Sequence, residues 1–498
     1  MPFRTAHGNS ISLGPQDCQK CKTRRIKCDR AFPECAKCTK RHYECPGYDN
    51  KLRWANAIAV RGRFKGMQFP SADMDDQQPT PGPKIDMHPG PSQESGYLGN
   101  RGGYAADVNL ALSFPNYATV AQLLDHYDKN IAGLMVWLDS EHNAYRRLVL
   151  PLAHRQPALM LSILAISAKH LSASGEIDSG FSKSACDAAV LAITESVQQV
   201  TTRLAEGHDF STEKDMETAE WMLASMLTLS GYEMMGSNSM NWETHRQAAR
   251  TLVNALVTAD RRDNELYTFL RNQLSILDVL ACTTNFDLGI TDGVILPETA
   301  RGDVIFGDFL KTIHSVTSKS REQYQARLIP VEGCSSSGIT FKDLCNSFEM
   351  ARGSTLMAAG DFQFDDESRK RDFIRMVEIY HHAGLLYSYR SPQLTDLDPS
   401  AVQYSKKRLF EILGDFENAL TWVPNFPWPV FILGIESHGD AVMQTFVRAV
   451  YRMIIQSVGS SHFETVLQFL KEFWAGQDSE WSTRAREWEL RGIRILAV

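Results

Sequence analysis

The sequence predicts a mostly α-helical protein in which a small N-terminal module and a linker precede one large all-α domain. Six of the ten cysteines fall between residues 18 and 45. Proline and glycine are concentrated in residues 67–113. From about residue 116 onward, apolar residues recur at the three- and four-residue spacing of helices, and strand-like alternation is nearly absent.

Charge is divided unevenly along the 498 residues. Residues 1–65 contain fifteen Lys and Arg against five Asp and Glu, a formal +10, and the remainder contains 37 against 54, a formal −17. A basic start on an acidic body indicates that the start contacts a polyanion. Residues 1–17 lack the apolar run of a signal peptide, so we expect a flexible tail on an intracellular protein without a membrane partner.

Residues 18–46 contain six cysteines in which the spacing C-x2-C-x6-C occurs twice. They are Cys18, Cys21, Cys28, Cys35, Cys38 and Cys45. In a reducing compartment this pattern favours a metal site over a disulfide-linked module. Six thiolates are too few for two separate tetrahedral sites, but they suffice for two Zn²⁺ if two sulfurs bridge both ions. Because so short a module has almost no apolar core, metal binding would supply most of its folding free energy.

The segment between Cys21 and Cys28 is strongly basic, since four of its six residues are Lys or Arg. On a short helix these cations would project as a group suited to phosphates and to the edges of guanine. The pattern therefore favours DNA binding over a purely structural zinc site.

Residues 18–46 closely resemble the binuclear cluster of the fungal Zn2Cys6 transcription factors. All six cysteines match the family pattern, and Pro33 stands in the loop between the halves, where the family has a proline. The resemblance implies two Zn²⁺ per chain, with Cys18 and Cys35 as the bridging thiolates. It also implies a nuclear protein that regulates transcription by binding double-stranded DNA.

The same resemblance implies a role for each cation of the module. Arg24 and Arg25 fall at the family's base-contacting position, with a CGG triplet in the major groove as the expected target. Lys22, Lys27 and Arg30 would contact phosphates. Regulators of this family commonly control nutrient pathways or secondary-metabolite gene clusters, which gives two classes of target genes.

Two linkers follow the module. Residues 47–66 are basic but show no sustained heptads, although the family often dimerises through a coiled coil at this place. We therefore expect a basic linker along the DNA backbone or part of a nuclear localisation signal, and a homodimer stays open. Residues 67–113 contain six prolines and six glycines, which predicts a disordered linker.

Residues 114–498 are predicted to form the all-helical domain, which is long enough to divide in two. Thr119 and Gln122 have the spacing of a capping box, and Pro157 suits the first turn of a buried helix over Ala158–Leu171. Pro424–Gly434 is expected to be a break. Further helices are predicted at 181–205, 213–235, 242–258, 263–284, 341–358, 369–389, 400–419, 438–457 and 461–475.

The helical body also resembles the regulatory region of one fungal subfamily. The stretches that carry this resemblance are Gln122–Tyr127, Leu150–Leu171, Trp242–Leu252, Tyr380–Tyr387 and Trp428–Gly434. The resemblance implies effector response, self-association, or contact with co-regulators or the transcription machinery.

Two other functions are left open by the residues themselves. The body could hold an enzyme or a small-molecule sensor with the zinc module as an accessory, but no P-loop, Rossmann fingerprint or H-E-x-x-H motif supports catalysis, so we do not predict an enzyme. The module could also be a zinc-dependent interaction domain that does not bind DNA.

Overall fold

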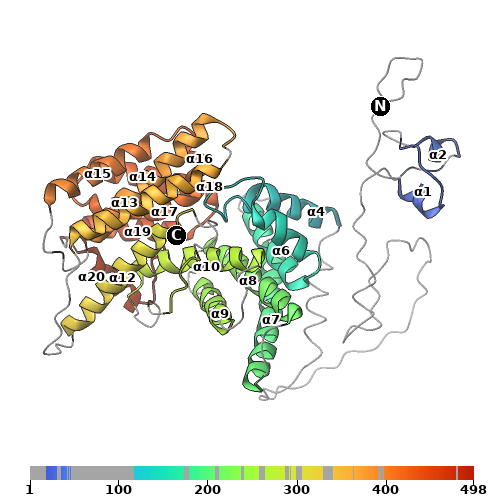
Figure 1. The fold of residues 1–498 in the computed structure, drawn as a ribbon, viewed down its shortest axis with the longest axis horizontal. Coiled ribbons are helices and arrows are strands. Elements are labelled where there is room, and N and C mark those ends of the chain that lie inside the picture. Colours follow the sequence, from blue (N-terminus) through green and yellow to red (C-terminus); the bar gives the residue numbers. More distant parts are fainter. Residues whose placement is uncertain are drawn as a thin grey trace, which may run out of the picture. The chain divides into compact units, whose positions relative to one another are not determined.

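The computed structural model describes the chain in two parts, which are treated separately. The first comprises residues 18–30, 35–41, 43 and 45; the second comprises residues 117–172, 179–207, 212–236, 241–256, 264–286, 291, 293–298, 305–328, 340–362, 364–390, 394, 398–477 and 480–498. Every element assigned within these ranges is helical, which confirms the predicted fold class (Figure 1). The predicted tail and both linkers lie outside them, so their boundaries stay predictions.

The helices follow one another closely along the chain. The first part contains α1 (Gln19–Thr23) and α2 (Ala36–Thr39). The second part begins with α4 (Tyr117–His126), the π-helices η2 (Tyr127–Ile131) and η3 (Tyr145–Val149), α5 (Leu150–Ala153), α6 (Pro157–Ser172), α7 (Ser179–Ala205), α8 (Glu213–Met234), α9 (Asn241–Ala255) and α10 (Glu265–Thr284). It continues with α12 (Gly307–Leu328), α13 (Phe341–Ala358), η4 (Ala359–Asp361), α14 (Glu367–Tyr389), α15 (Pro399–Gly414), α16 (Ala419–Trp422), η5 (Val423–Asn425), α17 (Pro427–Glu436), α18 (Ala441–Val458), α19 (His462–Ala475) and α20 (Trp481–Leu490).

Two large hydrophobic cores lie within the described residues of the helical part, and α10 contributes to both. The first core packs α6 against α7 and α8, and the second packs α14 against α13, α15 and α17. Leu270 and Leu274 belong to the first core, whereas Val279 and Leu280 belong to the second. The body is thus one compact unit with two cores, joined through a shared helix.

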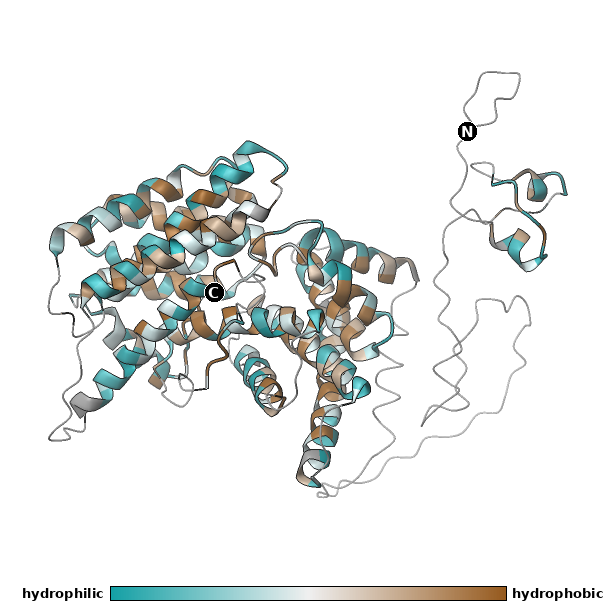
Figure 2. Ribbon diagram, viewed as in Figure 1, coloured by the Kyte–Doolittle hydropathy of each residue, from teal (hydrophilic) through white to brown (hydrophobic). Residues whose placement is uncertain are grey.

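The outer helices alternate between hydrophilic and hydrophobic residues, as amphipathic helices do (Figure 2). Helix α6 differs, because its residues from Ala158 to Ala168 are all buried, as its all-round apolar sequence predicts. It begins at Pro157, which confirms the predicted start. No helix among the described residues combines the length and the apolar character needed to cross a bilayer.

Two local predictions are wrong. Helix α4 already includes Tyr117, so Thr119 lies inside the helix and cannot cap it. The expected break at Pro424–Gly434 contains the last two residues of η5 and most of α17, and all ten residues of α17 are buried. The prolines of α17 fall in its first turn, where backbone N–H groups have no acceptor within the helix, so they do not interrupt it.

Helices α12 and α20 are absent from the predicted set. In α12 the buried face changes from Phe309 and Ile313 to Thr317 and Arg321. The guanidinium of Arg321 donates to the backbone oxygens of Cys282 and Thr283 at 3.2 and 3.1 Å. Because polar residues occupy the second half of the buried face of α12, its apolar residues do not recur at the helical spacing from which a helix is predicted.

A buried ionic network connects α9 to α10. Asp278 is fully buried and accepts hydrogen bonds from Arg246, from Arg250 Nε at 3.0 Å, and from the backbone N–H of Ile295 at 2.9 Å. Arg246 also donates to Glu243. Because each charge has a partner, the network is stable as a unit but depends on every member.

Replacing Asp278 with Ala should lower the free energy of unfolding by about 3–5 kcal/mol, because two buried guanidinium groups lose their counter-charge. The exposed Asp415 provides the matched control, since its replacement with Ala should change stability by about 0.5 kcal/mol or less. Chemical denaturation followed by circular dichroism measures both. Equal effects of the two substitutions would contradict this role of Asp278.

Candidate metal centre and nucleic-acid interface

The two half-units of the cysteine module begin in the same way, with a cysteine that caps a short helix. Cys18 precedes α1, and its Sγ accepts the backbone N–H of Cys21 at 3.4 Å. Cys35 precedes α2, and its Sγ accepts the backbone N–H of Cys38 at 3.3 Å. Such donors at a helix start favour the thiolate form of the sulfur. The repeat in the sequence is therefore a repeat in the structure.

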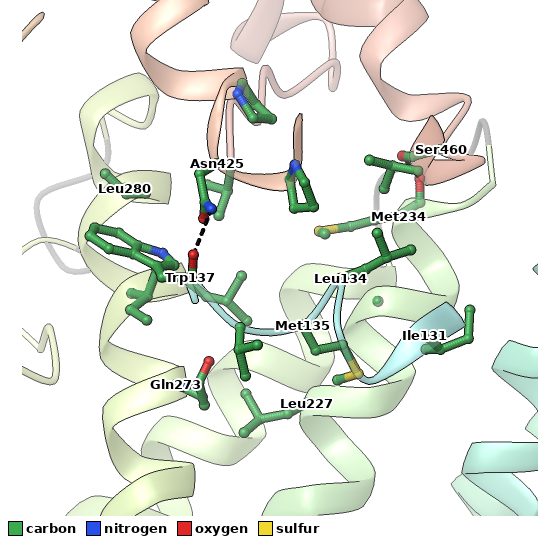
Figure 3. Close-up of a pocket in the computed structure, with 18 of the residues that line it drawn as sticks. Ile131, Leu134, Met135, Trp137, Leu227, Met234, Gln273, Leu280, Asn425 and Ser460 are labelled. Atoms are coloured by element: carbon green, nitrogen blue, oxygen red, sulfur yellow. Dashed lines mark hydrogen bonds between the residues drawn. The ribbon is translucent and has the colours of Figure 1, made fainter. Parts of the chain in front are cut away.

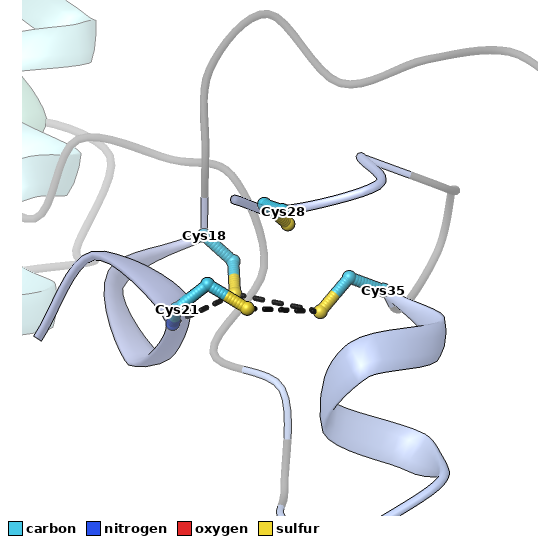
Figure 4. Close-up of side chains that lie close together, drawn as sticks. All are labelled: Cys18, Cys21, Cys28 and Cys35. Atoms are coloured by element: carbon cyan, nitrogen blue, oxygen red, sulfur yellow. Dashed lines mark hydrogen bonds between the residues drawn. The ribbon is translucent and has the colours of Figure 1, made fainter. Parts of the chain in front are cut away.

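The six sulfurs form two overlapping groups of four, within each of which the sulfurs lie no more than 4.8 Å apart. The groups are Cys18, Cys21, Cys28 and Cys35, and Cys18, Cys35, Cys38 and Cys45. The sulfurs of the first group face one another (Figure 4). Cys18 and Cys35, the pair that the sequence resemblance assigns as bridging ligands, are the two members common to both groups.

The sulfur separations fit zinc–thiolate chemistry. Cys18 Sγ lies 3.6 Å from Cys35 Sγ and 3.8 Å from Cys38 Sγ, and Cys21 Sγ lies 3.7 Å from Cys35 Sγ. Two sulfurs bound to one tetrahedral zinc at about 2.3 Å would be about 3.8 Å apart, whereas disulfide-bonded sulfurs are about 2.05 Å apart. All six cysteines are buried, and none of them forms a disulfide bond. The module is thus able to hold two Zn²⁺.

Burial opposes ionisation of the two shared thiols, Cys18 and Cys35, when no cation is present. It raises the pKa of Cys18 to about 12, and it also raises the pKa of Cys35. Zinc binds the thiolate, so binding must displace protons from these groups. Bound zinc would supply the positive charge that allows several sulfurs to remain ionised side by side.

Asp29 connects the half-units independently of the sulfurs. Its Oδ2 accepts the backbone N–H of Ala36 at 3.0 Å, and its Oδ1 accepts that of Lys37 at 3.4 Å. The carboxylate thus satisfies two N–H groups at the start of α2 that have no acceptor within the helix. The sequence analysis does not select Asp29, since one acid after Cys28 forms no recognisable pattern.

The basic segment leaves α1 through a left-handed residue, Arg25, with φ of 51°. The N–H of Arg25 donates to Lys22 O and the N–H of Ile26 donates to Cys21 O, each at 3.1 Å. These two bonds form a Schellman motif, in which glycine is the usual left-handed residue. An arginine here carries backbone strain of about 1 kcal/mol or more.

Arg24 is more enclosed than its neighbours. Its guanidinium lies 4.8 Å from the centroid of the Tyr43 ring, and the ammonium of Lys20 lies 5.2 Å from the same centroid. The sequence analysis selects neither Lys20 nor Tyr43. The four-residue spacing of Lys20 and Arg24 in a helix was the available signal for Lys20.

The remaining predicted DNA contacts are accessible. The exposed cations among them are Lys22, Arg25, Lys27 and Arg30, whereas Arg24 is half-buried. Lys22 lies in α1 and the other four follow within seven residues of its end, so all five belong to one short segment. Their individual roles stay predictions.

Both parts of the chain match known protein families. Residues 16–55 match the fungal Zn(2)-Cys(6) binuclear cluster domain. Residues 122–489, roughly three quarters of the chain, match the fungal specific transcription factor domain. The chain belongs to this transcription factor family. The resemblance seen in the sequence is thereby confirmed for both parts of this fungal transcription factor, including DNA binding as the function of the family and a binuclear zinc cluster.

One curated relative matches a short segment of this transcription factor. Arginine metabolism regulation protein II of Saccharomyces cerevisiae is 44% identical over 41 residues, which make up 8% of this chain and 5% of that protein. No solved structure matches the chain.

Shared and unshared cysteines should differ in their effect on zinc content. The purified chain should hold two Zn²⁺, Cys28→Ser should retain about one, and Cys18→Ser should retain close to none, because Cys18 belongs to both sulfur groups whereas Cys28 belongs to one. Elemental analysis of protein exchanged into zinc-free buffer measures this. Equal zinc loss in both variants would contradict a shared Cys18.

Proposed function

We propose that this transcription factor acts in the nucleus as a sequence-specific regulator of RNA polymerase II genes and binds promoter sites that contain CGG. The observation that carries the proposal is Arg25, whose side chain is exposed at the end of α1 although its backbone adopts a strained left-handed conformation. Strain of this kind persists where the surrounding structure fixes the backbone, and it occurs often at functional sites.

In this proposal the five cations have three roles. Arg25 donates to the O6 and N7 atoms of a guanine, the commonest specific contact of arginine in the major groove. Arg24, whose guanidinium packs on Tyr43, supports the same edge of the module. Lys22, Lys27 and Arg30 contact phosphates and set the orientation of the module on the duplex.

The helical body serves regulation and not catalysis in this proposal. Both matched families are transcription factor domains, and the buried charges around Asp278 pair with one another. The body would contact co-regulators or the transcription machinery and could join two chains in a homodimer. We assign the target genes to a nutrient or secondary-metabolite cluster, in line with the metabolic role named for the yeast relative. Genome-wide binding with transcript profiling of a deletion strain tests this assignment.

Arg25→Gly separates base contact from folding. Glycine relieves the strain at φ 51°, so the variant should keep two Zn²⁺ and an intact module. It should nevertheless lose about 1–3 kcal/mol of discrimination between a CGG duplex and one with a changed guanine. Fluorescence anisotropy with both duplexes measures this. Unchanged discrimination would show that Arg25 does not contact the base.

Lys27→Ala is the matched variant for a phosphate contact, since Lys27 is exposed and lies two residues from Arg25. It should weaken binding to both duplexes alike and should reduce the slope of log K against log salt by about 0.9. A salt series with the same anisotropy assay gives the slope. A loss confined to the CGG duplex would assign base contact to Lys27 instead.

A further inference from the structure

The helical body contains a cavity of about 150 Å³ at the junction of its two cores. Ile131, Tyr145 and Leu227 line it from the first core. Trp428 and Phe463 line it from the second. The cavity therefore lies where the helices of the first core, one half of the body, meet those of the second core, the other half.

Hydrogen bonds between the halves surround the cavity. Asn425 Nδ2 donates to the backbone oxygen of Trp137 at 2.8 Å, as drawn in Figure 3. Ser460 Oγ donates to the backbone oxygen of Met234. All four residues also line the cavity. Its polar atoms are thus largely occupied in joining the halves, which leaves an apolar interior.

Gln273 of α10 also lines the cavity. Unlike the polar groups of Asn425 and Ser460, its side chain has no hydrogen-bond partner among the described residues. Figure 3 shows its side-chain oxygen pointing into the space near Trp137 and Leu227. An amide in apolar surroundings is stabilised by a polar partner, and binding pockets commonly combine an apolar lining with a few such groups.

One wall of the cavity is irregular and adaptable. It follows η2, a π-helix that ends at Ile131, and π-helical turns often occur next to functional sites. Leu134, Met135 and Trp137 come from this connection, and Met234 and Met235 add two further methionines to the lining. Methionine side chains adjust readily to the shape of a bound molecule.

We propose that this cavity binds a small, flat, largely apolar molecule with one hydrogen-bonding group directed at Gln273. An apolar cavity of about 150 Å³ is large enough for benzene, so a ligand of one or two fused rings fits the space. Such a molecule would contact both cores and would stabilise their packing on each other. This proposal is independent of DNA binding.

Indole and indene are suitable probes, because they share one shape and only indole carries an N–H donor. Indole should bind the zinc-loaded full-length chain in calorimetry and should raise its Tm by about 2 °C or more near saturation. It should bind about fivefold more tightly than indene. Absence of both binding and a Tm shift would overturn the proposal.

Two variants locate the site. Leu134→Trp should fill the cavity and weaken indole binding tenfold or more, whereas Leu420→Trp, at a position 70% exposed, should not change it. Gln273→Leu should bring the affinities for indole and indene to within about twofold. Indole binding that is insensitive to both cavity variants would overturn the proposal; if Leu134→Trp does not fold, Gln273→Leu decides.

Discussion

The cysteine module depends on one constraint, the convergence of six sulfur atoms within reach of two metal ions. Among the described residues of the module, the buried cluster consists of cysteines alone, so apolar packing cannot replace the metal. Cys18 and Cys35 occupy equivalent places as helix caps and belong to both sulfur groups. Because Cys18 caps the start of α1, the position of its sulfur also orients the helix and the Arg25 residue that follows it.

The helical body is stabilised by other interactions than the cysteine module. Its two cores share α10, which also carries the buried Asp278 network and Gln273 in the cavity. Covalent metal ligation fixes the module, whereas the body combines apolar burial with paired buried charges. The two parts are therefore expected to respond differently to perturbation: zinc removal unfolds the module, and loss of a buried charge weakens the body.

Features that depend on residues close together in the sequence can be predicted from it, whereas contacts between distant segments cannot. Ligand spacing is local, so all six cysteines were predicted to lie together, and amphipathic spacing predicted α13 and α14 closely. The prolines of α17 predict a break when the sequence is taken alone. The helix tolerates them only because they fall in its first turn. Asp29 and Tyr43 act across the two half-units, and the cavity arises between two cores, so no sequence pattern indicates them.

The most direct test of the central claim is a zinc titration of the metal-free, reduced full-length chain in the presence of a labelled CGG duplex, followed by anisotropy. A bridged cluster predicts no specific binding without zinc and a rise that is complete at two equivalents per chain, since one ion leaves the second sulfur group without metal. Specific binding without zinc, or a rise complete at one equivalent, would contradict the account.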